Sequence, residues 1–220
     1  MRAVAQRLTG AVQAALATLA QLEPLAPRFS RLYQERGHCH VLLKQAPQAI
    51  AAFLQAVHVN PALPTSWSML ERLYRMTGQT ADAQAAAAHV AKLKELSPEV
   101  VTATALFSDG ELDQAEKMIR AFLLGHGHHV EAMRLLARIG VERDVLDDAQ
   151  LLLEAVLELA PDYDAARFDY AQVLVKRQLH ALAQAEAEKL LVAEPANRNY
   201  RALFATTCVG LGLHERAIGL

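Results

Sequence analysis

The sequence predicts an all-α protein built of antiparallel helix pairs that stack into a solenoid. Alanines recur through the chain at intervals of 34 residues, with a single interval of 32. They are Ala15, Ala49, Ala83, Ala115, Ala149, Ala183 and Ala217. Prolines stand 12 residues after four of these alanines, and glycines stand five residues before three of them. Because three residue types share one period, the pattern indicates a structural repeat and not a bias in composition.

Each period predicts two helices in a fixed order. The first helix ends near Gly78, Gly110 or Gly212, where the turn needs a backbone conformation that glycine adopts freely. The second helix begins just before the phased alanine and tends to carry acid in its first turn, which suits the positive end of the helix dipole. Proline then ends that helix and opens the next period. In the first full period Pro47 lies near the start of the second helix, where its missing N–H costs little.

The repeats divide the chain into a short N-terminal part and a long solenoid. Residues 1–29 are predicted to form a partial repeat, and residues 30–220 about five full repeats plus a truncated last repeat. Arg2 and Arg7 precede an alanine-rich run whose larger apolar residues recur at helical spacing. We therefore expect an amphipathic helix there and not the unbroken apolar core of a signal peptide.

Two features depart from the regular period. The repeat around Ala115 is two residues short, so we expect a brief first helix over 98–107 and a local change in superhelix geometry. The last repeat stops at Leu220 without a polar capping helix. Because solenoid ends need such a cap, we expect either a longer parent protein or an edge that packs on a second copy.

The composition narrows the classes of partner. The formal net charge is −2 and apolar residues make up 53% of the chain. No electrostatic attraction to nucleic acid or to an anionic membrane is expected, and no apolar stretch is long enough to span a bilayer. The two cysteines, Cys39 and Cys208, suggest no disulfide framework, so a reducing, cytoplasmic location is predicted.

Residues at fixed positions of the period resemble the tetratricopeptide repeat (TPR). One period carries Trp67-x2-Leu70-x3-Tyr74, followed by Gly78 and Ala83. Two others carry Tyr33, Gly37, Ala49-x3-Phe53, Ala56 and Pro61, and Met133, Leu136, Ala137, Ala149, Leu153, Val156 and Pro161. The resemblance covers nearly the whole chain and implies a right-handed superhelical solenoid whose concave surface binds peptides. Because this family has many partners, the resemblance specifies a fold more closely than a function.

The same resemblance implies that positions 2, 5, 9 and 12 of each first helix line the concave groove. The predicted groove residues are His38, Arg72, Arg75, Phe107, Arg134, Arg138, Phe168 and Gln172. Arginine forks suit carboxylates and phosphates, so the predicted partner is a protein or peptide with an acidic or carboxylate-bearing segment. The alternative is a solvated helix face whose arginines pair with Glu71, Glu131 or Glu142.

The motifs of common enzymes are absent from the sequence. It holds no phosphate-binding loop, nucleophile elbow or zinc-protease motif, so neither catalysis nor a cofactor is expected within these residues. His126, His128 and His129 follow or flank glycines, which lets their side chains converge. A structural zinc site needs four ligands, and only Glu131 is near enough to add one, so no metal is predicted.

Three functions remain open. The first is a non-catalytic TPR scaffold that binds proteins through its groove. In the second, residues 107–123 and 151–174 resemble in general texture the N-terminal repeats of bacterial fusions with a downstream sulfotransferase domain. The chain would then position the substrate of a catalytic domain beyond Leu220. The third is a homodimer that forms through the uncapped C-terminal edge. This edge consists of Leu211, Leu213, Ala217 and Leu220.

Overall fold

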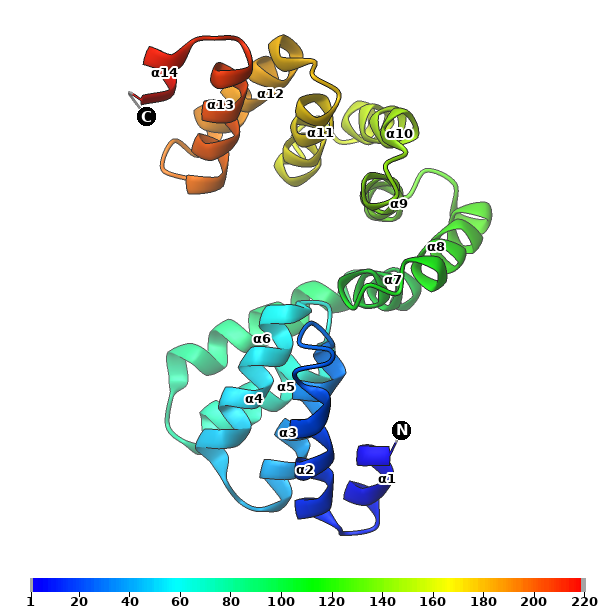
Figure 1. Cartoon of the computed structure of the whole chain (residues 1–220), viewed down its shortest axis with the longest axis vertical. Helices are drawn as coiled ribbons and strands as arrows, with labels where there is room; N and C mark the ends of the chain where they lie inside the picture. Colours follow the sequence, from blue (N-terminus) through cyan, green and yellow to red (C-terminus); the bar gives the residue numbers. More distant parts are fainter. Residues whose placement is uncertain (1, 219–220) are drawn as a thin grey trace. The chain divides into compact units, whose positions relative to one another are not determined.

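The chain is helical throughout the part that the structure describes. A computed structural model describes the backbone of residues 2–218 and the side chains of residues 2–216. Fourteen α-helices and no strand occur in this part of the chain (Figure 1). They are α1 (Arg2–Leu8), α2 (Val12–Leu22), α3 (Ser30–Leu42), α4 (Ala46–Val59), α5 (Pro64–Met76), α6 (Thr80–Lys94), α7 (Pro98–Ser108), α8 (Leu112–His126), α9 (Val130–Glu142), α10 (Leu146–Leu159), α11 (Asp164–Lys176), α12 (His180–Ala193), α13 (Arg198–Gly210) and α14 (His214–Ile218). The all-α prediction is confirmed.

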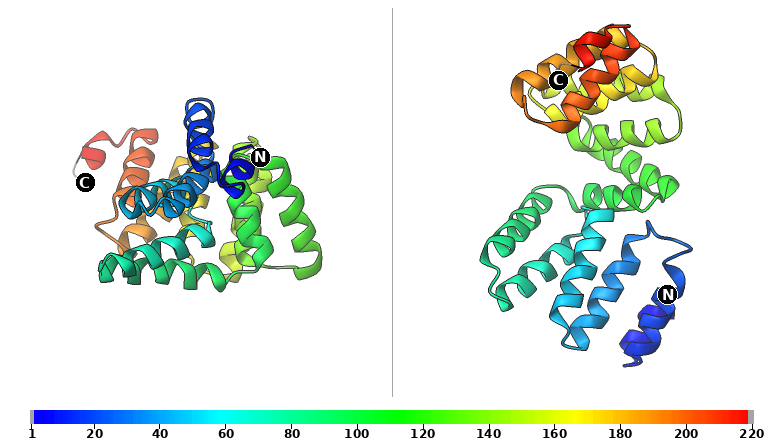
Figure 2. Two further views of the ribbon diagram at one scale, coloured as in Figure 1. Left: turned by 90° about the horizontal axis from the view of Figure 1, so that it is seen from below. Right: turned by 60° about the vertical axis from the view of Figure 1, so that its left-hand side comes forward.

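The chain divides into two compact units after Ala115, inside α8. In the first unit α3 packs on α4, α4 on α5, and α5 on α6, as the neighbouring ribbons in Figure 2 show. In the second unit α9 packs on α10, α10 on α11, α11 on α12, and α12 on α13. The predicted helix pairs, stacked in chain order, are therefore confirmed within each unit.

The phased alanines are buried where the second helix of each pair begins. Each second helix begins three residues before its alanine, as α4 does at Ala46 before Ala49. The six alanines of the series whose side chains are described are at most 4% exposed. A Cβ added at Gly140 of α9 would lie 3.5 Å from Ala149 Cβ of α10. A larger side chain at the alanine position would separate the two helices, since packed cores tolerate little added volume.

The turn inside each pair closes with one residue in the left-handed conformation. That residue is glycine at 10, 78, 110 and 212, but Lys44 (φ 58°), Asp144 (φ 60°) and Gln178 (φ 62°) occupy the same place. Its N–H bonds to the carbonyl three residues back, and the next N–H reaches five residues back, as in Gln45 N to His40 O at 2.9 Å. This is the Schellman pattern, which satisfies the last carbonyls of the first helix.

The N-terminal segment differs from the single amphipathic helix that we expected. It forms α1 and α2, because Gly10 at φ 83° closes a turn of the kind found in the later pairs. The first helix of the short repeat, expected over 98–107, is α7 and ends at Ser108. No helix among the described residues is both long enough and apolar enough to cross a membrane.

A buried polar cluster ties the end of α7 to the start of α3 within the first unit. The Asp109 carboxylate, only 1% exposed, accepts the backbone N–H of Ser30 at 3.2 Å. The Asn60 amide donates to Ser30 Oγ at 3.3 Å and to the carbonyl of Ala105 at 2.9 Å. Asp109 therefore caps a helix 79 residues away in sequence, and its negative charge suits the positive end of α3.

Candidate binding surfaces

Four of the predicted groove residues lie in the first unit: His38, Arg72, Arg75 and Phe107. They differ in how far their side chains are exposed. His38 of α3 packs edge-on against the Phe53 ring at 5.2 Å between centroids, and burial lowers the pKa of its imidazole. Phe107 of α7 is half-buried. Arg72 and Arg75 of α5 are exposed and three residues apart, so they lie on one face of that helix.

The two α5 arginines differ in their partners. Arg75 pairs with Glu71 at 2.6 Å and remains 69% exposed. Arg72 makes no hydrogen bond or ion pair with any residue that the structure describes. One groove arginine, Arg75, thus pairs with a nearby glutamate, as the alternative interpretation expected. Arg72 beside it keeps a free guanidinium. Such a group can accept a carboxylate without first losing an internal partner.

In the second unit the predicted arginine Arg134 is part of an internal network. Its Nε donates to Asp169 Oδ2 at 2.7 Å, and its Nη1 donates to the Tyr163 hydroxyl at 2.9 Å. That hydroxyl in turn donates to Glu131 Oε1 at 2.6 Å. The network joins α9 to α11, and the side chains of Arg134 and Asp169 are 20% and 14% exposed.

Burial and the bond to Glu131 raise the pKa of Tyr163 to about 12, so the phenol is neutral and can donate to the carboxylate. The Arg134 guanidinium also lies 5.3 Å from the centre of the Tyr163 ring. Because all these contacts are formed within the chain, Arg134 holds two neighbouring helix pairs together. A ligand carboxylate would have to compete with Asp169 for this arginine.

The other predicted residues of the second unit lie on the same two helices. Arg138 stands one turn after Arg134 on α9 and is half-buried, and burial lowers the pKa of its guanidinium. Phe168 of α11 lies 5.7 Å from the Tyr200 ring, and Gln172, one turn later, is exposed. The structure thus divides the predicted groove residues into four in each unit.

The histidines of the 126–129 segment make contacts that serve the helix ends. His126 stacks on Phe122 at 4.1 Å, and its Nδ1 lies 2.9 Å from the carbonyl of that residue. His129 packs edge-on against the same ring, and its Nδ1 accepts the N–H of Ala132 at 3.3 Å, which caps α9. Among the side chains that the structure describes, no three His, Cys, Asp or Glu residues gather as a metal site.

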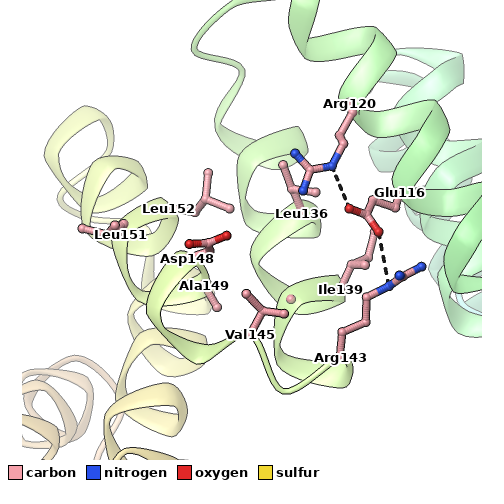
Figure 3. Close-up of a pocket in the computed structure, with 11 residues that line it drawn as sticks. Glu116, Arg120, Leu136, Ile139, Arg143, Val145, Asp148, Ala149, Leu151 and Leu152 are labelled. Atoms are coloured by element: carbon pink, nitrogen blue, oxygen red, sulfur yellow. Dashed lines mark hydrogen bonds and ion pairs between the residues drawn. The ribbon is translucent and has the colours of Figure 1, made fainter.

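A hollow between α8, α9 and α10 was not predicted from the sequence (Figure 3). Its volume is about 310 Å³, at the lower end of the ~300–1,000 Å³ range of small-molecule pockets. Leu136 and Ile139 of α9 line it, together with Val145 and Leu152 on the α10 side. The signal in the sequence was weak, because an apolar residue beside a charged one is normal on any helix surface.

Charged side chains stand at the rim of this hollow. Glu116 of α8 binds Arg120 Nε at 2.7 Å and Arg143 Nε at 3.2 Å, as the dashed lines in Figure 3 mark. Asp148 of α10 stands across the opening from Arg120. The hollow is therefore an apolar recess with the ion-paired Arg120, Glu116 and Arg143 on the α8 and α9 side and the Asp148 carboxylate on the α10 side.

Comparison with known proteins gives similarity in solved structures alone. No family model and no curated protein matches the chain. MamA protein is 16% identical, with 88% of each chain covered and a TM-score of 0.46. A tetratricopeptide repeat protein from Parabacteroides merdae is 14% identical over 93% of this chain and 81% of its own, with a TM-score of 0.49. A thermophilic TPR protein from Thermus thermophilus is 18% identical over 82% of this chain and 99% of its own, with a TM-score of 0.48.

The period, the Schellman turns and the chain-order stacking give each unit an all-α, TPR-like fold of stacked antiparallel helix pairs. Identities of 14 to 18% carry no information on function.

Proposed function

We propose that the chain is a non-catalytic scaffold that binds other proteins through the inner faces of its helix pairs. The ligand is a segment with acidic side chains or a terminal carboxylate. In this proposal His38, Arg72, Arg75 and Phe107 form the binding surface of the first unit, and Arg134, Arg138, Phe168 and Gln172 form that of the second.

The observation that carries the proposal is the state of the α5 arginines. Arg72 has no partner among the described residues, and Arg75 is 69% exposed beside it. Glu71 pairs with Arg75 alone, so these three side chains together leave one positive charge on this part of α5. Arginine binds carboxylates through paired N–H donors, so this face suits an acidic segment. We therefore assign the first contact with the ligand to α5 and not to Arg134, whose donors are occupied.

The test compares two pairs of charge-removing substitutions in the same unit. The immobilised chain is used to capture partners from cell extract, and the acidic segment of an identified partner is then titrated as a synthetic peptide. Arg72→Ala with Arg75→Ala should weaken the peptide by ~10-fold or more, equal to about 1.4 kcal/mol, and binding should weaken further with added salt. Lys92→Ala with Lys94→Ala on α6 removes the same charge and should leave the affinity unchanged. Equal affinities for both variants would refute the role of α5.

Two other functions have their own tests. Whether the chain positions substrate for a bacterial sulfotransferase is decided by the reading frame after Leu220. The C-terminal edge that could form a homodimer includes Leu211 and Leu213, each 39% exposed, whereas the Ala217 side chain and Leu220 lie outside the described residues. Light scattering of Leu213→Glu against the wild type tests that edge. The cytoplasmic location stays a prediction.

A further inference from the structure

The hollow in the second unit has an arginine on one wall and a carboxylate on the opposite wall. Arg120 stands on the α8 wall with its side chain 61% exposed, and its Nε is held by Glu116. Asp148 stands on the α10 wall and faces the same opening (Figure 3). Glu116 shares its carboxylate between Arg120 and Arg143, and Arg120 is still largely exposed, so a second carboxylate can reach its guanidinium. A surface with an arginine on one side of an apolar centre and a carboxylate on the other is complementary to itself after a two-fold rotation.

An exposed leucine lies beside the acidic wall. Leu151 is 65% exposed although it lines the hollow, and Val145 at the other end of this wall is 44% exposed. Asp148 and Leu151 are three residues apart, so they project from one face of α10. That face therefore offers an aliphatic side chain and a carboxylate, which are the groups that the apolar recess and Arg120 would receive. Leu151 differs from a lone exposed leucine because it adjoins the apolar lining of the hollow, which makes one continuous apolar surface.

We propose that this surface is a two-fold interface between two copies of the chain. In the pair, α10 of each copy lies across the hollow of the other. Leu151 enters the partner's recess between α8 and α10, and Asp148 pairs with the partner's Arg120. The occupant is a second copy because the chain itself supplies both halves of the complementary pattern on one surface. The inference is independent of the proposed peptide binding, which uses α5.

The apolar contact is tested by light scattering over a dilution series of the full chain. The wild type should change from dimer to monomer on dilution. Leu151→Glu should raise the dimer dissociation constant by ~100-fold or more, since both copies lose their anchor and gain a buried charge. Leu182→Glu on α12, where the leucine is 55% exposed, is the matched control and should leave dimerisation unchanged. Circular dichroism checks that each variant keeps its helix content.

The charge contact is tested by reversal and exchange. Arg120→Glu and Asp148→Arg should each weaken the dimer by ~10-fold or more, because each places two pairs of like charges in the interface. An equimolar mixture of the two variants should form a heterodimer, in which every contact again joins opposite charges. The double variant should likewise dimerise with itself. Misfolded variants would not regain association when they are mixed or combined, so recovery of the dimer shows that the charges themselves make the contact.

Three results would overturn the inference. The wild type could stay monomeric at the highest concentration, Leu151→Glu could leave a dimer intact, or the mixture could fail to associate while both variants remain folded. A dimer that is dissolved by Leu213→Glu and not by Leu151→Glu would place the interface at the C-terminal edge instead. Peptide binding measured on Leu151→Glu keeps the two proposals separate, since it should equal that of the wild type.

Discussion

Replacing Lys44 by glycine should stabilise the first unit, although it removes a side chain. Lys44 closes the turn between α3 and α4 at φ 58°, a left-handed conformation in which its Cβ comes too close to the following carbonyl oxygen. The left-handed conformation costs an ordinary L-residue ~1–2 kcal/mol, and glycine escapes this cost. Glycine also gains freedom in the unfolded chain, which offsets roughly 0.4–1 kcal/mol of the benefit. The expected net gain is about 0.5–1 kcal/mol, or a rise in Tm of about 2 °C for a chain of this size.

Trp67 provides the measurement. It is the single tryptophan of the chain and lies on α5 in the same unit, stacked on His89 at 4.0 Å between ring centroids. Its fluorescence in a urea titration therefore reports unfolding of the first unit. Gly78→Ala, in the equivalent turn between α5 and α6 at φ 77°, should lower the free energy of unfolding by about 1 kcal/mol and so lower the urea midpoint.

The control separates conformation from charge. Lys44→Ala removes the same amine but keeps a Cβ in the left-handed region, so it should leave the midpoint near that of the wild type. If Lys44→Ala stabilises the unit as much as Lys44→Gly does, the effect belongs to the charge and the conformational argument is refuted. An unchanged midpoint for Lys44→Gly would refute it as well.

Three further predictions concern the two units. Gly37→Ala should cost the first unit about 1–2 kcal/mol in a urea titration, because the new Cβ would lie 2.7 Å from a fully buried phenylalanine ring, and this overpacking outweighs the gain in helix propensity. Burial lowers the pKa of His38, so the unfolded chain binds a proton that the folded chain does not. The stability of the first unit should therefore be complete above the ordinary histidine pKa of about 6.5 and decrease as the pH falls below it, and His38→Gln should make this decrease shallower. Tyr163→Phe removes the hydroxyl that joins Arg134 to Glu131 and should cost about 1–2 kcal/mol, measured by circular dichroism in urea; a loss below the error of the fit would contradict the network's role.

The helix pairs could be predicted because their signals are local and repeated. A helix that packs closely on its neighbour needs a small residue in the contact, and the six phased alanines whose side chains are described are all buried. The turn position, five residues earlier, follows from the same phase. Its residue does not, because Lys44, Asp144 and Gln178 take the left-handed conformation that glycine takes in the other turns. Hydrogen bonds at the helix end and the packing of the pair hold these residues in place despite the strain.

The candidate sites could be predicted only as faces of helices. The repeat pattern placed both Arg72 and Arg134 on the predicted groove face, yet Arg72 has no partner among the described residues and Arg134 is held by Asp169. The difference arises because a side chain on a repeat meets its neighbours from the next pair, here 35 residues along the chain. The hollow beside α8 has the same origin, since its walls belong to three helices whose separation no spacing rule gives.

The sequence by itself determined the period, the order of the helices and the faces that are buried, since these follow from backbone geometry and small residues repeated at one interval. Only the tertiary structure decided which charges are paired and where an apolar recess opens. Asp109 capping α3 from 79 residues away is the clearest case, because a contact across that distance depends on the stacking of every helix pair between them.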